Sequence, residues 1–175
     1  WSTGDLQNPN EVLQDKYADL LKRSMTSDKV IKIADQEDLK KAQITKQNET
    51  NTWKWKAENI TDVALAVSDH YNWDAASVVV DSTNMRRASV QAAYDEESED
   101  FKKMVGYAQH ALSWFSHNYP GVPYPFSKSS TVRGFADMEY PMMVNDSSTP
   151  DDDFTRFVVE HEIAHTYFPF YMGIN

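Results

Sequence analysis

The sequence predicts an α+β fold, and three observations support that prediction. Short segments that alternate apolar and polar residues, as strands do, are concentrated in the first half of the chain. Two long segments with apolar residues every three or four positions, as amphipathic helices have, lie in the second half. The chain has 175 residues, 41% of them apolar, so it can bury a hydrophobic core. We expect a division near residue 95, between a β-rich part at 1–94 and a part at 95–175 that carries both long helices.

The β-rich part is expected to open with a helix. Asn8 suits the N-cap position, Pro9 suits the first turn, and Glu11 completes a capping box. Apolar residues then follow at helical spacing as far as about Arg23. The other expected elements of this part are strands at 29–33, 52–57, 63–68, 77–81 and 88–94, and a short polar helix at 36–42.

The second part is expected to alternate helices with strands. Its expected elements are a helix at 96–117 headed by acidic residues, strands at 131–133 and 140–144, and a final helix. The final helix has Thr149 as its N-cap residue and Pro150 at its first position. The acids at 151–153 favour the positive end of its dipole, and the helix ends before Pro169.

Composition and charge exclude several classes of function. The formal net charge of -10 repels phosphate backbones and argues against nucleic-acid binding. The longest apolar runs are only a few residues, so the sequence predicts no membrane span. The absence of cysteine excludes disulfides, thiolate metal sites and cysteine nucleophiles, and it leaves both a cytoplasmic and an extracytoplasmic compartment open. Neither end, at Trp1 or at Asn175, has the polar composition common at natural termini, so we expect an internal piece of a longer protein.

The strongest chemical signal is His161-Glu162-Ile163-Ala164-His165, an HExxH pattern inside the final expected helix. Two histidines four positions apart project from one helical face, so both imidazoles can reach one zinc ion. Glu162 lies to one side of that pair, where its carboxylate can accept a proton from a zinc-coordinated water. The pattern therefore predicts a zinc site with His161 and His165 as ligands and Glu162 as the catalytic base.

Other candidate residues are expected to be structural. The aromatic residues around the strand expected at 52–57 could form a ligand platform, but packing in the core is the expected role; they are Trp53, Trp55, Tyr71 and Trp73. Strict alternation places Trp53 and Trp55 on the same face of that strand. The remaining histidines, at His70, His110 and His117, are expected to be solvated or packed rather than ligands.

The residues around the HExxH pattern resemble a known family. The segment 159–168 resembles the zinc helix of the gluzincin aminopeptidases of the aminopeptidase N type, whose catalytic domain is thermolysin-like. About twenty residues upstream, Ala136-Asp137-Met138-Glu139-Tyr140 is similar to the GxMEN exopeptidase sequence of that family. The chain departs from GxMEN at Ala136, which stands for the glycine, and at Tyr140, which stands for the asparagine.

The resemblance extends to domain organisation. The segment 53–75 is similar to the end of the β domain that precedes the catalytic domain in the family. The resemblance therefore implies that 1–94 is the C-terminal part of a β-rich N-terminal domain. It implies that 95–175 is the first part of a thermolysin-like domain, which ends just after the zinc helix.

The resemblance also implies a function. It implies a zinc metallopeptidase that removes N-terminal residues from peptides, in which Glu139, beside Met138, binds the free α-ammonium group of the substrate. The third zinc ligand, a glutamate, is expected beyond Asn175, and so is the tyrosine that stabilises the oxyanion. The 175-residue chain is therefore expected to be inactive by itself and to bind zinc poorly.

Two alternative functions stay open at this point. Some members of the same family hydrolyse an epoxide with the same zinc, and a non-catalytic scaffold could keep the fold for binding. A degenerate scaffold is expected to lose the glutamate or a histidine of the pattern, and this sequence keeps all three. The expected partners are a peptide substrate, the remainder of the chain, and alternatively a second copy packed on the apolar face of the final helix.

Overall fold

The structure is a computed structural model that describes residues 1–41 and 43–173. It contains both helices and strands in one mixed arrangement, which confirms the predicted mixture of α and β structure. Ala42, the last residue of the helix expected at 36–42, and the final residues 174–175 lie outside the described residues.

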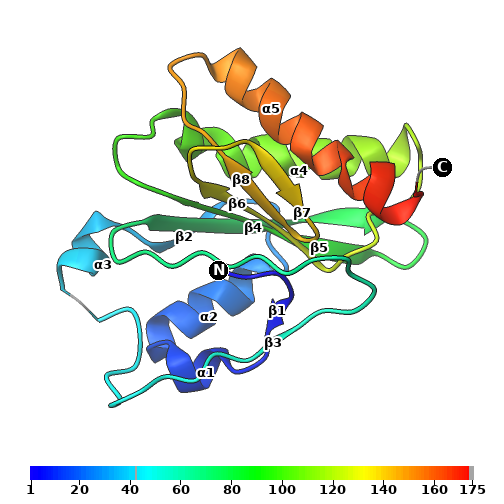
Figure 1. Cartoon of the computed structure of the whole chain (residues 1–175). Helices are drawn as coiled ribbons and strands as arrows, with labels where there is room; N and C mark the ends of the chain where they lie inside the picture. The colour runs from blue at the N-terminus through cyan, green and yellow to red at the C-terminus, as the bar shows by residue number, and fades with distance from the viewer. Residues whose placement is uncertain (42, 174–175) are drawn as a thin grey trace.

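A six-stranded mixed sheet forms the centre of the fold (Figure 1). Its order is β2-β4-β5-β6-β8-β7. The strands are β2 (Ile31–Ala34), β4 (Asn72–Asp81), β5 (Arg86–Tyr94), β6 (Lys128–Arg133), β7 (Met138–Tyr140) and β8 (Met143–Asp146). The β4–β5 and β7–β8 pairs are antiparallel, whereas β5–β6 and β6–β8 are parallel. Strands from both sides of residue 95 thus belong to one sheet, and the division near that residue stays a prediction.

Two helices cover one face of the sheet, α4 (Met104–His117) and α5 (Asp152–Ala164) (Figure 1). The α4 helix supplies the crossover that parallel neighbours such as β5 and β6 require. Its buried face packs with α5 and the sheet in the largest core cluster, which includes Phe101, Leu112, Tyr124, Val159 and Tyr167. This packing fixes the position of α5, which carries the HExxH residues, above the sheet.

The N-terminal elements lie on the other face of the sheet (Figure 1). They are β1 (Asp5–Leu6), α1 (Pro9–Val12), α2 (Asp15–Ser24), α3 (Gln36–Lys40) and β3 (Trp55–Lys56), with β1 and β3 pairing as a separate two-stranded sheet. A second core cluster there packs Leu13, Tyr17, Leu21 and Ile33 against Trp73 of β4.

Four predictions for the β-rich part are wrong in detail. The helix expected from Asn8 to Arg23 is split into α1 and α2, because Leu13 is extended and forms a bridge with Thr45. Asn8 occupies the N-cap position of α1 and Pro9 lies in its first turn, as predicted, but the expected capping box does not form: the Asn8 side chain donates to the Glu11 carboxylate at 2.8 Å and accepts from the Lys54 amide. No strand forms at 63–68, where a single bridge joins Leu65 to the N-terminal segment, and the strand at 52–57 shortens to β3.

The second part differs from the prediction at three element ends. The helix expected at 96–117 begins as a 3-10 turn at Asp100–Lys103 and becomes α-helical only in α4. The single strand expected at 140–144 is a hairpin, β7 and β8, which turns at Met142 with a φ of 67°. Asp151, not Thr149, caps α5 by accepting from the amides of Asp153 and Phe154. The prediction that this helix ends before Pro169 is confirmed, since α5 gives way to a π-helical turn at Thr166–Tyr171.

Candidate metal centre

The helix α5 brings the two histidines of the pattern together. The Nε2 atoms of His161 and His165 lie 3.2 Å apart, and the ring centroids lie 4.7 Å apart with an interplanar angle of 85°. Two nitrogens bound to one tetrahedral zinc at its usual bond length are about 3.4 Å apart. The spacing of the two nitrogens therefore fits a single zinc ion.

The residues after α5 settle which nitrogen of His165 can bind a metal. Phe168 leaves helical geometry, with φ of -135° and ψ of 99°, and its carbonyl oxygen lies 3.0 Å from Nδ1 of His165. Since a carbonyl can only accept, Nδ1 carries the proton and Nε2 keeps its lone pair. A backbone carbonyl in this position is the outer partner that metal-binding histidines ordinarily have.

Glu162 is buried beside this pair. The residue is only 6% exposed, and its Oε2 has no hydrogen-bond partner among the described residues. Burial raises the pKa of the Glu162 carboxyl; the nearby His161 and His165 oppose that effect, and the charge of Glu139 adds to it. An unpaired buried carboxylate with a raised pKa is suited to accept and return a proton.

A carboxylate from another element faces this centre. Strand β7 contacts α5 and presents Glu139, half-buried, close enough to Glu162 for its charge to act on that carboxyl. Met138, the residue before it, is partly exposed. The structure therefore places Glu139 near Glu162, although 22 positions separate Glu139 from His161 in the sequence.

The other histidines are exposed and occupied elsewhere. His110 lies 2.8 Å from Glu160, His70 lies 2.8 Å from Asp69, and His117 contacts the Ser113 carbonyl. Within the part of the chain that the structure describes, the one group of three potential metal ligands is His161, Glu162 and His165, whose ligand atoms lie within 4.8 Å of one another.

Sequence reasoning missed one feature of this region, a pair of acids at the open end of the β7–β8 hairpin. Asp146, at the end of β8, is almost fully buried, and Asp137 precedes β7. The hairpin register would have identified the pair, but a single strand was expected at 140–144. The charges of Asp137 and of Glu162 both act on Asp146, so the pair belongs to the same electrostatic environment as the HExxH residues.

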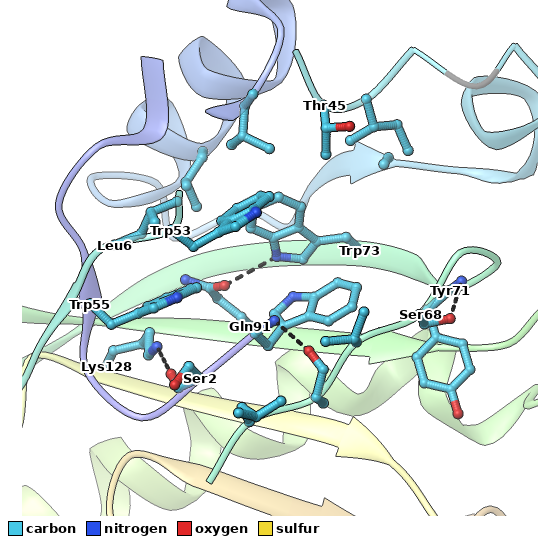
Figure 2. A pocket seen from close by; sticks show the side chains of 18 of the residues that line it. Ser2, Leu6, Thr45, Trp53, Trp55, Ser68, Tyr71, Trp73, Gln91 and Lys128 are labelled. Atoms are coloured by element: carbon cyan, nitrogen blue, oxygen red, sulfur yellow. Dashed lines mark hydrogen bonds between the residues drawn. The ribbon is translucent and has the colours of Figure 1, made fainter. Parts of the chain in front are cut away.

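The tryptophans line a separate cavity of about 780 Å³ on the opposite face of the sheet (Figure 2). Trp53 and Trp55 stack with ring centroids 6.5 Å apart, which confirms that they share a face. Trp73 is buried and donates from Nε1 to Gln91, as core packing requires. Trp53, however, is 40% exposed and lines the cavity wall, so its expected role in the core is wrong.

The fold and the site together define a mixed α/β protein with a candidate zinc centre on α5. No protein-family model matches the chain, and no curated protein matches it. Within the described residues, no helix has both the length and the apolar character that crossing a membrane requires.

Proposed function

We propose that this protein is a zinc-dependent metallopeptidase, an aminopeptidase of the gluzincin class. The observation that carries the proposal is the arrangement of His161, Glu162 and His165 on α5. Two imidazole nitrogens 3.2 Å apart suit one zinc ion, and beside them lies the buried carboxylate of Glu162, whose Oε2 has no hydrogen-bond partner among the described residues. That the chain keeps all three residues favours an enzyme over a non-catalytic scaffold.

The metal-binding atoms would be Nε2 of His161 and Nε2 of His165, with a third ligand expected beyond Asn175. Zinc, when bound, lowers the pKa of a coordinated water to roughly 7 and polarises a carbonyl. Glu162 accepts a proton at its carboxylate from the attacking water and returns it to the leaving amine nitrogen. The burial of Glu162 supports this role, because a raised pKa brings a carboxyl closer to the value that proton exchange near neutral pH requires.

Glu139 gives the proposed peptidase its preference for a free amino terminus. A carboxylate fixed on β7 beside the metal position pairs with an α-ammonium group, and an N-acetylated peptide lacks that charge. An ion pair of this kind places the first peptide bond, rather than an internal one, at Glu162. The epoxide hydrolases of the same class remain an alternative that substrate tests must separate.

The proposed domain organisation follows the resemblance with one adjustment. We assign the end of a β-rich domain to the N-terminal elements and the first part of a thermolysin-like domain to the residues that lead to α5. A division before Asn72 keeps β4 and β5 in the same sheet as β6, whereas a division near residue 95 separates them. The exposed side chains of Phe154 and Phe157 on α5 would then be covered by the remainder of the catalytic domain.

The proposal is tested by zinc content and hydrolysis together, on the full-length natural protein. A free aminoacyl anilide and its N-acetylated form are the substrates, and an epoxide is the third. We expect one zinc per molecule and hydrolysis of the free aminoacyl anilide only. Zinc without peptide hydrolysis but with epoxide opening would replace the peptidase proposal, and no stoichiometric zinc would overturn both.

A further inference from the structure

Two carboxyl side chains oppose each other at the open end of the β7–β8 hairpin. The register pairs Met138 with Asn145 and Glu139 with Val144. Continued one step beyond Met138, the same register sets Asp137 opposite Asp146, and the Asp137 carboxylate acts on the Asp146 carboxyl through both charge and hydrogen bonding. Two like charges directly opposite each other destabilise an antiparallel pair, so the two acids are not both expected to be ionised.

Burial distinguishes the two acids. Asp146 is 1% exposed, and its Oδ2 has no hydrogen-bond partner among the described residues. Asp137 is exposed, and its Oδ1 accepts from the amide of Ser147 at 2.8 Å and from the Ser147 hydroxyl at 2.6 Å. A buried carboxylate without a partner is costly, whereas an exposed one that accepts two hydrogen bonds is not. Asp137 is therefore the ionised member of the pair, and Asp146 is the protonated one.

We propose that Asp146 stays protonated and donates a hydrogen bond to the Asp137 carboxylate, and that this carboxyl–carboxylate pair positions Glu139. The proposal rests on the proposed function, because Glu139 is assigned there to the substrate ammonium group. In this proposal Asp146 contacts neither the substrate nor the metal position. It acts on Glu139 indirectly, by holding the β7–β8 hairpin in place.

The electrostatic surroundings agree with this assignment. Burial raises the pKa of Asp146 to about 8, and the hydrogen bond and charge of Asp137 and the charge of Glu162 on α5 add to that effect. Arg133 pairs with Asp146 in the register of β6 and β8, but its Nε lies 3.2 Å from Asp95, a different carboxylate. The groups that act on Asp146, Asp137 just before β7 and Glu162 on α5, are thus acidic and favour its neutral form.

The backbone around the two aspartates connects their hydrogen bond to the position of Glu139. The segment that leads into β7 is fastened to the end of β8: the Gly134 amide donates to the Asp146 carbonyl at 2.8 Å, and Asn145 Nδ2 donates to the Ala136 carbonyl at 2.7 Å. At Gly134 a Cβ would lie 1.6 Å from the Asn145 side chain, so only glycine permits this close approach. Asp137 is the last residue of that segment, two positions before Glu139. Ionising Asp146 would therefore put two negative charges together at the point that anchors β7.

The first experiment measures the protonation of Asp146 and needs no activity. Carboxyl carbons of the metal-free 175-residue chain are followed by NMR against pH, with Asp146→Asn to assign the resonance. Asp153→Asn, at an exposed acid in the first turn of α5, is the control. We expect one aspartate to titrate above pH 7, and to be missing only from Asp146→Asn. Asp137→Asn should move that titration to lower pH, since it removes the facing charge. Titration of Asp146 below pH 5 would overturn the proposal.

The second experiment measures positioning in the full-length natural protein loaded with zinc. Asp146→Ala should raise KM for a free aminoacyl substrate by about tenfold, the loss of a hydrogen bond to a charged group, with a smaller change in kcat. Asp146→Asn keeps a donor to Asp137 and should restore KM. The activity of the natural protein is expected to decline between pH 7 and 9, and that of Asp146→Asn is not. An Asp146→Asn variant that behaves as Asp146→Ala would overturn the positioning role. If Asp146 titrates above pH 7 but the natural protein cleaves no peptide, the proposed function fails and the acid pair stands.

Discussion

The Nδ1 atom of His165 donates a hydrogen bond to the carbonyl of Phe168, 3.0 Å away in the turn that follows α5. The contact orients the imidazole and leaves Nε2 unprotonated, 3.2 Å from Nε2 of His161. The turn after α5 therefore shapes the candidate metal centre as directly as the helix itself does. Phe168 has non-helical dihedral angles, as the residue before a proline is biased to have, and its carbonyl can therefore reach back to His165.

Loss of either histidine should abolish zinc binding. In the full-length natural protein, His161→Ala and His165→Ala each remove one of the three protein ligands that a catalytic zinc requires. We expect metal analysis after dialysis to find zinc in the natural protein and none in either variant. His110→Ala, which changes an exposed histidine paired with Glu160, should keep its zinc. Zinc retained by His161→Ala and His165→Ala alike would place the metal elsewhere.

Glu162→Gln should abolish turnover while zinc stays bound. The carboxylate is buried, its Oε2 has no hydrogen-bond partner in the part of the chain that the structure describes, and the amide that replaces it cannot accept the proton of the attacking water. The expected loss in kcat is at least the 10²–10⁴-fold typical of general acid–base catalysis. Glu160→Gln is the matched control, because Glu160 precedes the pattern on α5 and pairs with Arg156 instead. Full activity of Glu162→Gln would remove this residue from the mechanism.

Local sequence patterns predicted that the two candidate metal ligands lie on one face, because a helix fixes its own spacing. His161 and His165 share a face of α5 whatever the rest of the chain does, and the helix itself was evident from its apolar periodicity. Glu139 was found only through the resemblance to GxMEN, since no local rule connects β7 to α5. Asp146 was missed altogether: its importance comes from its burial and from the register of a hairpin whose turn, at Met142, has no glycine or asparagine to announce it.

Strand predictions held where a partner exists and were wrong where none does. The alternation at 88–94 became β5, which has partners on both sides, β4 and β6. The segment 63–68, apolar up to Ser68, was also expected to be a strand, but there Val63, Leu65 and Val67 are exposed and one bridge is all that forms among the described residues. A local sequence pattern shows only that a segment can form a strand. Whether it does so depends on a partner strand that is supplied by residues far away in the sequence.

Glu139→Ala should discriminate between substrates with and without a free amino terminus. If Glu139 binds the α-ammonium group, its loss weakens free-amine substrates by the roughly 1.5–3 kcal/mol of a charge-assisted hydrogen bond. N-acetylated peptides, which lack that charge, should be almost unaffected. Comparing kcat/KM for the two substrate types in the natural protein and the variant measures the difference. Equal losses on both types would show that Glu139 is structural.

Lys128 should make the stability of the fold rise at alkaline pH. This lysine is 3% exposed at the start of β6, where its ammonium group donates to the carbonyls of Ser2 and Gly4 and lies 4.9 Å from the Trp55 ring. Burial lowers the pKa of Lys128 to about 8, from an ordinary value of 10.5. Between these two values the unfolded chain binds more protons than the folded one, so the free energy of unfolding increases with pH. The increase from this one group is at most on the order of 3 kcal/mol.

The measurement is urea unfolding of the natural chain and of Lys128→Met at pH 7.5 and pH 10. Other lysines and tyrosines also titrate in this range, so the useful quantity is the difference between the two proteins at each pH. Lys128→Met keeps the apolar stem without the charge, and its stability relative to the natural chain should therefore fall as the pH rises. Lys22→Met, at an exposed position of α2, is the control and should show no such change. A difference between Lys128→Met and the natural chain that is constant across pH would mean that Lys128 titrates in the folded protein as it does in the unfolded one, and that its two carbonyl contacts and the Trp55 ring fully offset its burial.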